Sequence, residues 1–272
     1  MESVVWAFKK LYDKGLCYET TRIMPYSWKC GTALSNFETK MDGAYREKVS
    51  DSVVVRFELY DEKLDSLMKK FQLDENNRVY VLAWSTTAWT MPSNLALAVN
   101  SELDYVLLKK GGDIHILAKE LAKVYKHELG EDQIGVVKGQ DLIGAKYYPL
   151  FDYFKNIENA FQIFAGDDFV TAESGTGIVH MAPGFGEDDH DLCVKKGIKP
   201  VCPIDAAGVF TQEVTDFVGM QVFDSIPHVI KKLKVERKLI RVAQYRHNYP
   251  FCWRTDTPII YRAIPSWYVN VV

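Results

Sequence analysis

The sequence lacks several features that would place it in a specialised class of protein. No run approaches the roughly 18 consecutive apolar residues of a membrane span, so we expect no membrane association. The opening residues MESVVW have no basic segment before an apolar run, which argues against a secretory signal. Internal repeats and low-complexity segments are also missing, so a repeat architecture is not expected.

Cysteine is scarce and the net charge is small. The 272 residues contain five cysteines, an odd number, scattered along the chain. This favours free thiols in a reducing compartment, and we predict a cytoplasmic location. The net charge of −3 neither indicates nor excludes a nucleic-acid partner, because such binding depends on local patches. The apolar share of 47% is enough for an ordinary core.

Strand patterns dominate the middle of the chain. Runs of β-branched and aromatic residues predict strands at 50–59, 79–84, 161–164 and 177–181, with a hairpin between 104–109 and 113–117. Helical spacing predicts helices at 2–14, 119–128, 188–196 and 225–238, and 25–48 is predicted to be rich in loops. We therefore predict a mixed α/β, β-rich fold: a closed or nearly closed barrel with peripheral helices. An all-β sandwich is the alternative.

A cluster of hydroxyl side chains follows one predicted strand. Residues 84–94 have the sequence WSTTAWTMPSN, with four hydroxyls within six positions. Hydroxyls donate and accept hydrogen bonds, so they can hold an ester carbonyl, a ribose hydroxyl or a water. Serine and threonine also favour helix caps and turns, so capping is the structural alternative.

A second segment joins a strand to three carboxylates. Residues 175–189 have the sequence GTGIVHMAPGFGEDD, in which a predicted strand carries His180. Glu187, Asp188 and Asp189 fall at the start of a predicted helix, where the macrodipole favours negative charge, so capping alone could explain them. The glycines form no dinucleotide-binding fingerprint, because His180 stands where the third glycine would be.

Together the two segments resemble the editing domain, also called connective peptide 1 (CP1), of class I aminoacyl-tRNA synthetases for aliphatic amino acids. WTMP at 89–92 followed by Asn94 is similar to the isoleucine enzyme, because the valine and leucine enzymes carry an arginine in this motif. The resemblance covers nearly the whole chain and looks closest to eukaryotic cytosolic forms. It is also carried by VCPID at 201–205, EVTDF at 213–217 and YPFCWR at 249–254.

The resemblance implies a role for each residue of the two segments. Asp189 would pair with the α-ammonium of the bound aminoacyl group. Thr86 and Thr87 would contact the ester and the terminal ribose and help to place the water. Thr90 and His180 would form a wall that stops the longer isoleucine side chain. Asp189, Thr86 and Thr87 are thus the candidate catalytic residues.

Other residues of the threonine segment would support this site. Asn94 would hold the threonine loop by bonding backbone groups, and Ser85 keeps the hydroxyl of the threonine usual at its position. Trp84 is a candidate substrate-binding residue, although packing is favoured over stacking for it and for Trp89. No general base is obvious, and positioning with help from a ribose hydroxyl is the favoured route.

The resemblance also implies a domain plan, cofactors and partners. We expect residues 1–47 to lead to a catalytic core outside this chain, 48–245 to form the editing domain, and 246–272 to return toward that core. The motifs that would hold ATP are missing, so ATP and magnesium belong to the parent enzyme, and this chain needs no cofactor. The expected partners are the acceptor end of tRNA(Ile), the valine moiety of misacylated tRNA and the catalytic core.

Three further hypotheses remain open. Bacterial relatives have two Cys-x-x-Cys pairs that bind zinc, but this chain keeps only Cys30 and Cys252 of them, so we predict no metal. A metal hydrolase built on His180, Asp188, Asp189 and His190 is the weaker enzyme alternative. A non-catalytic insert that binds tRNA or stabilises its parent is the alternative from another class. Basic residues around 195–199 and 231–241 form either a solvated face or a contact to tRNA phosphates.

Overall fold

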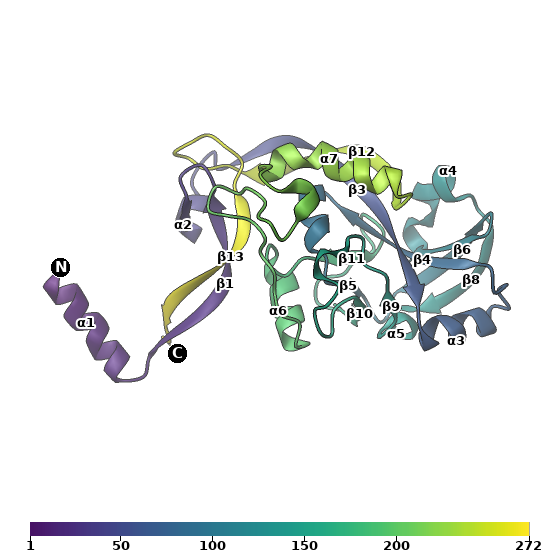
Figure 1. Cartoon of the computed structure of the whole chain (residues 1–272), viewed down its shortest axis with the longest axis horizontal. Helices are drawn as coiled ribbons and strands as arrows, with labels where there is room; N and C mark the ends of the chain where they lie inside the picture. Colours follow the sequence, from purple (N-terminus) through teal and green to yellow (C-terminus); the bar gives the residue numbers. More distant parts are fainter. Residues whose placement is uncertain (272) are drawn as a thin grey trace.

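The computed structural model describes residues 1–271. Figure 1 shows a wide β-rich body and a narrow antiparallel ribbon that carries both ends of the chain. The ribbon pairs the first and last strands, β1 (Cys17–Ser27) and β13 (Ile260–Val269), with β2 (Thr32–Ala33) beside β1. Helix α1 (Glu2–Asp13) precedes the ribbon, and its exposed Phe8 and Tyr12 rings pack on Trp267 of β13.

Six strands of the described chain close into a barrel in the body. The ring runs β3, β9, β10, β5, β11 and β4, and β4 pairs back with β3. Their bounds are β3 (Tyr45–Tyr60), β4 (Arg78–Ser85), β5 (Ala96–Val99), β9 (Lys146–Tyr147), β10 (Gln162–Ala165) and β11 (Ile178–Met181). The β-rich barrel predicted from the sequence is therefore confirmed, and the sandwich alternative is wrong.

Further strands extend the barrel on both sides. β7 (Asp113–Ala118) joins β4, and β6 (Asp104–Lys110) and β8 (Gln133–Lys138) follow it. The predicted hairpin is β6–β7, and Gly111 takes the positive φ of +62° that its tight turn requires. On the other side, β12 (Leu239–Pro250) pairs with β3 from Tyr45 to Val55.

Helices cover the outside of the barrel. Helix α2 (Asn36–Thr39) lies beside the ribbon, and the α-helices of the body are α3 (Glu62–Lys70), α4 (Lys126–Leu129), α5 (Gly139–Leu142), α6 (Glu187–Lys195) and α7 (Val222–Val235). Helix α7 buries Val222, Ser225, Val229 and Leu233, one stripe at helical spacing. The 3₁₀ helices are η1 (Ala88–Ser93), η2 (Lys119–Tyr125), η3 (Asp152–Phe154) and η4 (Thr215–Phe217), so the helix predicted at 119–128 is 3₁₀ from Lys119 to Tyr125 and α-helical only from Lys126.

The core fills the barrel and its outer layer because strand residues alternate between the two faces. Val53, Val55 and Phe57 of β3 belong to the main core, whereas Val54 packs in a second cluster with Leu82 of β4. All of these side chains are fully buried or nearly so. Burying one side chain of this size stabilises the fold by about 1.5–3 kcal/mol. Burial on both faces explains why β4 is an almost unbroken apolar run.

The structure adds detail to two parts of the sequence prediction. Residues 25–48, predicted to be rich in loops, also contain the end of β1 at Ser27, β2, α2 and the start of β3 at Tyr45. The predicted return segment, 246–272, contains a strand that pairs within this chain. Its strand β13 pairs with β1 over the register Cys17↔Val269 to Tyr26↔Ile260. Val272 lies outside the described residues. The domain limits at 47 and 245 stay a prediction, although β3 and β12 both run across them.

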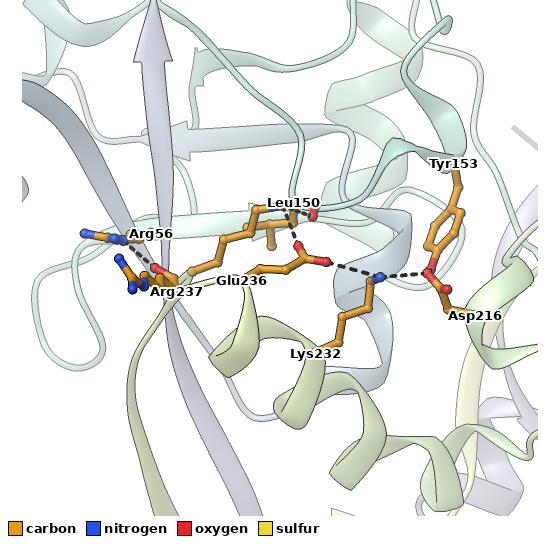
Figure 2. A network of polar contacts seen from close by, with 8 residues as sticks. Arg56, Leu150, Tyr153, Asp216, Lys232, Glu236 and Arg237 are labelled. Carbon is orange, nitrogen blue, oxygen red and sulfur yellow. Dashed lines mark hydrogen bonds and ion pairs between the residues drawn. The ribbon is translucent and has the colours of Figure 1, made fainter.

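A network of charged groups holds α7 to the loops beneath it (Figure 2). The Nζ atom of Lys232 lies 3.0 Å from a carboxylate oxygen of Asp216 and 3.1 Å from one of Glu236. Tyr153 donates its hydroxyl to Asp216, and Glu236 also pairs with Lys238 at 2.8 Å. The network joins the last turn of α7 to η3 and η4.

Replacing Lys232 by methionine is expected to lower the free energy of unfolding by about 1 kcal/mol or less, because partly exposed ion pairs contribute little. Lys232→Met keeps most of the apolar stem and removes the charge that bridges Asp216 and Glu236. Urea denaturation measures the change. The matched control is Lys231→Met, an exposed neighbour on the same helix, which should leave stability unchanged. Equal effects of the two substitutions would show that the network contributes nothing.

Candidate functional site

The threonine segment occupies the end of β4 and the start of η1. Ser85 is the last residue of β4, and its Oγ accepts a hydrogen bond from the Thr87 amide at 3.1 Å. The Thr90 hydroxyl donates to the Thr87 carbonyl at 2.9 Å, and Thr87 Oγ1 lies 3.1 Å from Ser85 Oγ. These local bonds shape the turn, whereas Thr87, the N-cap of η1, makes no side-chain capping bond.

The histidine strand meets this turn. His180 lies on β11, and its Nε2 is 3.0 Å from Thr90 Oγ1. Its other ring nitrogen, Nδ1, is 2.8 Å from Nδ2 of Asn94, the residue that ends η1. Thr90, Asn94 and His180 are all buried. The structure therefore brings together residues from the two segments that the sequence singled out.

The partners of His180 fix its protonation. The Asn94 amide nitrogen also donates to the Ala96 carbonyl at 2.9 Å, so this atom is the donor and His180 Nδ1 is the acceptor. The proton of the neutral ring is then on Nε2, which donates to Thr90. Burial lowers the pKa of His180 to about 3, so the ring stays neutral near pH 7. It holds the turn and is poorly suited to act as a general base.

Asp189 is a partly exposed carboxylate at the start of α6. One oxygen accepts a hydrogen bond from the Ala182 amide at 2.7 Å, just after the end of β11. Gly186 allows this position, because a Cβ there would lie 2.6 Å from the Asp189 carboxyl carbon. Burial raises the pKa of Asp189 to about 6, although the Ala182 amide opposes the change. Its neighbours Glu187 and Asp188 are exposed.

The two segments also pack against each other through rings. Phe185, which precedes α6, meets Trp89 of η1 edge to face at 4.8 Å between ring centroids. Trp89 is buried, as packing requires. Thr86 and Thr87 are partly exposed, and within the described part of the chain no protein group bonds the Thr86 hydroxyl. The arrangement offers one hydroxyl without a protein partner, Thr86, one partly exposed carboxylate, Asp189, and the buried hydrogen-bonded pair of Thr90 and His180.

Trp84 lies apart from this arrangement. It belongs to the outer core layer, whereas Ala83 of the same strand faces the barrel interior. Its ring meets Tyr245 at 5.1 Å in an edge-to-face contact, and it lines a cavity of about 260 Å³. The structure thus does not place Trp84 with the other candidates, and a substrate contact for it stays a prediction.

The metal-hydrolase alternative has no geometric support. Within residues 1–271, no group of three or more His, Cys, Asp or Glu side chains is arranged to hold a metal. His180 instead bonds Thr90 and Asn94, and His190 lies 3.4 Å from Asp191. The helices described here also include none long and apolar enough to cross a membrane.

Half of the basic residues predicted as a cluster near α7 are paired with carboxylates. Lys232 and Lys238 pair with Glu236, and Arg241 lies 3.3 Å from Glu128. Lys231 and Lys234 are exposed on α7. Both alternatives for this cluster, a solvated face and a tRNA contact, therefore stay predictions.

The whole chain matches one known protein family. The model of the family "tRNA synthetases class I (I, L, M and V)" matches residues 1–272. The chain belongs to this class I tRNA synthetase family. Within the family it is similar to isoleucine–tRNA ligases: 52% identical over 274 residues to that of Rickettsia canadensis, and 49% over 309 residues to that of Rickettsia bellii.

This class I chain is much shorter than those relatives. Both alignments include 100% of the chain but only 25% and 28% of the relatives, so the chain spans about a quarter of their length. The relatives compared are bacterial, and the predicted closeness to eukaryotic forms is not supported by them.

Two solved structures share the fold of this chain's body. The crystal structure of GlLeuRS-CP1 aligns with 72% of this chain and 99% of its own at a TM-score of 0.58, with 18% sequence identity. The editing domain of the cytosolic leucyl-tRNA synthetase of P. falciparum aligns with 71% of this chain at a TM-score of 0.55 and 9% identity. The body therefore has the fold of these editing domains.

Sequence patterns missed some residues that shape the site. Tyr147 on β9 donates its hydroxyl to Asn94 Oδ1 at 2.7 Å, yet it lies in no recognisable motif. The role of Gly186 beside Asp189 follows only from the structure. For Tyr147 no signal in the sequence was available, because its partner is 53 residues away along the chain.

Proposed function

We propose that this chain is the editing site of an isoleucyl-tRNA synthetase, which hydrolyses the ester between valine and tRNA(Ile). The observation that carries the proposal is the hydrogen bond between Thr90 and His180, which joins the threonine segment to β11, with the Asp189 carboxylate bonded to the Ala182 amide just after that strand. Membership in the class I family and the editing-domain fold support it.

The chemical need for such a site comes from a small difference in size. Valine is one methylene shorter than isoleucine, a difference of about 1–3 kcal/mol in a binding pocket, and this pair is the standard illustration of that limit. A second site can reverse the selection if it admits valine and blocks isoleucine. Thr90 and His180, held rigidly by hydrogen bonds, supply a wall suited to this task.

Each side chain then has a defined part in the hydrolysis. The Asp189 carboxylate binds the α-ammonium group of the valyl ester, which in turn lowers the pKa of the carboxyl. Thr86 and Thr87 bond the ester or ribose oxygens and orient the attacking water. The water oxygen bonds to the carbonyl carbon, and the ester oxygen leaves with the ribose. A substrate hydroxyl assists the proton transfer, because His180 is neutral and bonded at both nitrogens.

The test compares hydrolysis of valyl-tRNA(Ile) and isoleucyl-tRNA(Ile) by the chain. We expect the valyl ester to be cleaved at least roughly tenfold faster, which corresponds to the lower part of the energy range for one methylene. Cleavage of neither ester while tRNA binding is retained would contradict the proposal and favour a non-catalytic tRNA-binding insert. Equal cleavage of both would contradict the assignment of the wall.

A further inference from the structure

A buried tyrosine stands behind the proposed specificity wall. Tyr147 is fully buried on β9, and its ring is fixed edge to face between Phe57 at 5.1 Å and Phe161 at 6.0 Å. Its hydroxyl donates to Asn94 Oδ1 at 2.7 Å. Burial raises the pKa of Tyr147 well above its usual value, so the hydroxyl remains protonated wherever the protein is folded.

The hydrogen bonds around Asn94 leave one consistent assignment of donors and acceptors. Asn94 Oδ1 accepts from Tyr147, and both protons of Nδ2 are used, one by the Ala96 carbonyl and one by His180 Nδ1. A rotated amide would place its oxygen against the Ala96 carbonyl oxygen and its nitrogen against Tyr147. It would also require the other tautomer of His180, with the proton on Nδ1.

The chain of bonds continues to the turn that carries the reactive hydroxyls. His180 Nε2 donates to Thr90 Oγ1, and the Thr90 hydroxyl donates to the Thr87 carbonyl. With the other tautomer, Nε2 would become an acceptor and the Thr90 proton would turn toward it. The Thr87 carbonyl would then keep only the Thr90 backbone amide as a donor and lose the Thr90 hydroxyl, so the orientation of the Asn94 amide governs the direction of the side-chain bonds that follow.

We infer that Tyr147 is a positioning residue for editing, which acts through Asn94 to hold His180 in the Nε2–H tautomer and to keep the Thr90–His180 wall rigid. Tyr147 itself is buried behind the wall and acts only through other residues. The inference rests on the proposed function for its effect on selectivity, whereas the tautomer can be observed without any substrate.

The first experiment is two-bond ¹H–¹⁵N NMR of the histidine rings, which separates the two neutral tautomers. We expect His180 of the wild-type chain to carry its proton on Nε2 alone at pH 7. In Tyr147→Phe the ring packing is kept and one donor is lost, so Asn94 Oδ1 is left buried without a partner. A measurable share of the Nδ1–H form is then expected. The signal of His180 is assigned by its loss in His180→Gln.

The second experiment measures selectivity in the same variants. Tyr147→Phe is expected to reduce the ratio of valyl to isoleucyl hydrolysis by roughly tenfold, the effect of losing one buried hydrogen bond on a binding step. Tyr26→Phe is the matched control, since it removes a buried tyrosine of the ribbon strand β1 as the donor to the Ala206 carbonyl. It should change neither the His180 spectrum nor the ratio.

Two results would overturn the inference. One is a wild-type His180 with its proton on Nδ1. The other is a Tyr147→Phe chain whose His180 spectrum equals that of the wild type, whatever its thermal stability. If the wild-type chain cleaves neither ester, the proposed function fails, and the NMR spectra alone still decide the role of Tyr147.

Discussion

Replacing Asp189 by asparagine is expected to abolish hydrolysis of the valyl ester and to stabilise the fold. Asparagine keeps an acceptor for the Ala182 amide, which now lies 2.7 Å from the carboxylate, but cannot form an ion pair with an α-ammonium group. Loss of such a partly buried charge pair costs about 2–5 kcal/mol, so the rate should fall by at least roughly thirtyfold.

The stabilisation follows from the raised pKa of Asp189. The carboxyl has a pKa of about 6 in the folded chain against 3.8 as its ordinary value, because burial penalises the charge. Between these two values the folded state binds more protons than the unfolded state. Stability therefore decreases as the pH rises through this window, and the penalty is complete above pH 6. Asp189→Asn should remove it and add about 1–2 kcal/mol at pH 7, after discounting for partial exposure.

Asp188→Asn is the matched control for this prediction. Asp188 is the adjacent residue of the same helix turn, carries the same charge and is exposed. Single-turnover deacylation assays and urea denaturation at pH 4 and pH 7 measure both effects. Normal deacylation by Asp189→Asn would contradict the assignment of Asp189 as the residue that binds the α-ammonium group. A loss of stability at pH 7 would show instead that the carboxylate has a structural role.

Lowering the pH from 7 to 4 is expected to destabilise the chain strongly, and His115→Phe should remove a large part of that loss. His115 lies on β7, is buried, and stacks on Tyr80 at 5.7 Å between ring centroids. Neither of its ring nitrogens has a hydrogen-bond partner. Burial lowers the pKa of His115 to about 4, and the positive charge of Arg56 contributes in the same direction.

His115 changes the stability with pH in the opposite direction to Asp189. Between pH 4 and the ordinary value of 6.5, the unfolded state binds a proton at His115 that the folded state does not. Stability is thus present above pH 6.5 and is lost as the pH falls through the folded pKa. The loss from His115 amounts to about 3 kcal/mol below pH 4. His180, with a pKa lowered to about 3 by burial, adds a loss in the same direction.

Urea denaturation of wild type and His115→Phe across pH 4 to 7.5 checks the prediction. Phenylalanine matches the ring and removes two buried unpaired nitrogens, so the variant should also be about 1 kcal/mol more stable at pH 7. His127→Phe is the control, because His127 is exposed on α4. Parallel pH profiles of wild type and His115→Phe would show that His115 does not cause the acid sensitivity.

Much of the fold follows from local patterns in the sequence. β3 and β4 were predicted within a few residues, since their β-branched and aromatic residues form long buried runs. The hairpin β6–β7 was predicted from its two glycines, and α6 and α7 from helical spacing. The short strands β5, β8 and β9 were missed, because two to six residues carry too little periodicity.

The long-range pairings could not be predicted in the same way. The pairing of β1 with β13 joins residues about 250 positions apart, and neither strand alternates cleanly between apolar and polar residues. No local propensity encodes such a pairing, since the hydrogen bonds are made only when the chain ends meet. For the same reason, local patterns in the sequence could not predict that β3 and β4 pair and close the barrel.

The sequence by itself determined the chemistry available to this protein: the hydroxyl cluster at 85–90, the carboxylates at 187–189 and His180, in an order that resembles one family. The tertiary structure decided which of these groups act together. In the folded chain Trp84 packs in the outer core layer, and the Asp189 carboxylate accepts a hydrogen bond from the Ala182 amide. His180 lies between Thr90 and Asn94 and is bonded to both. Protonation and direction of a hydrogen bond depend on burial and on partners brought from distant strands, and a linear motif contains neither.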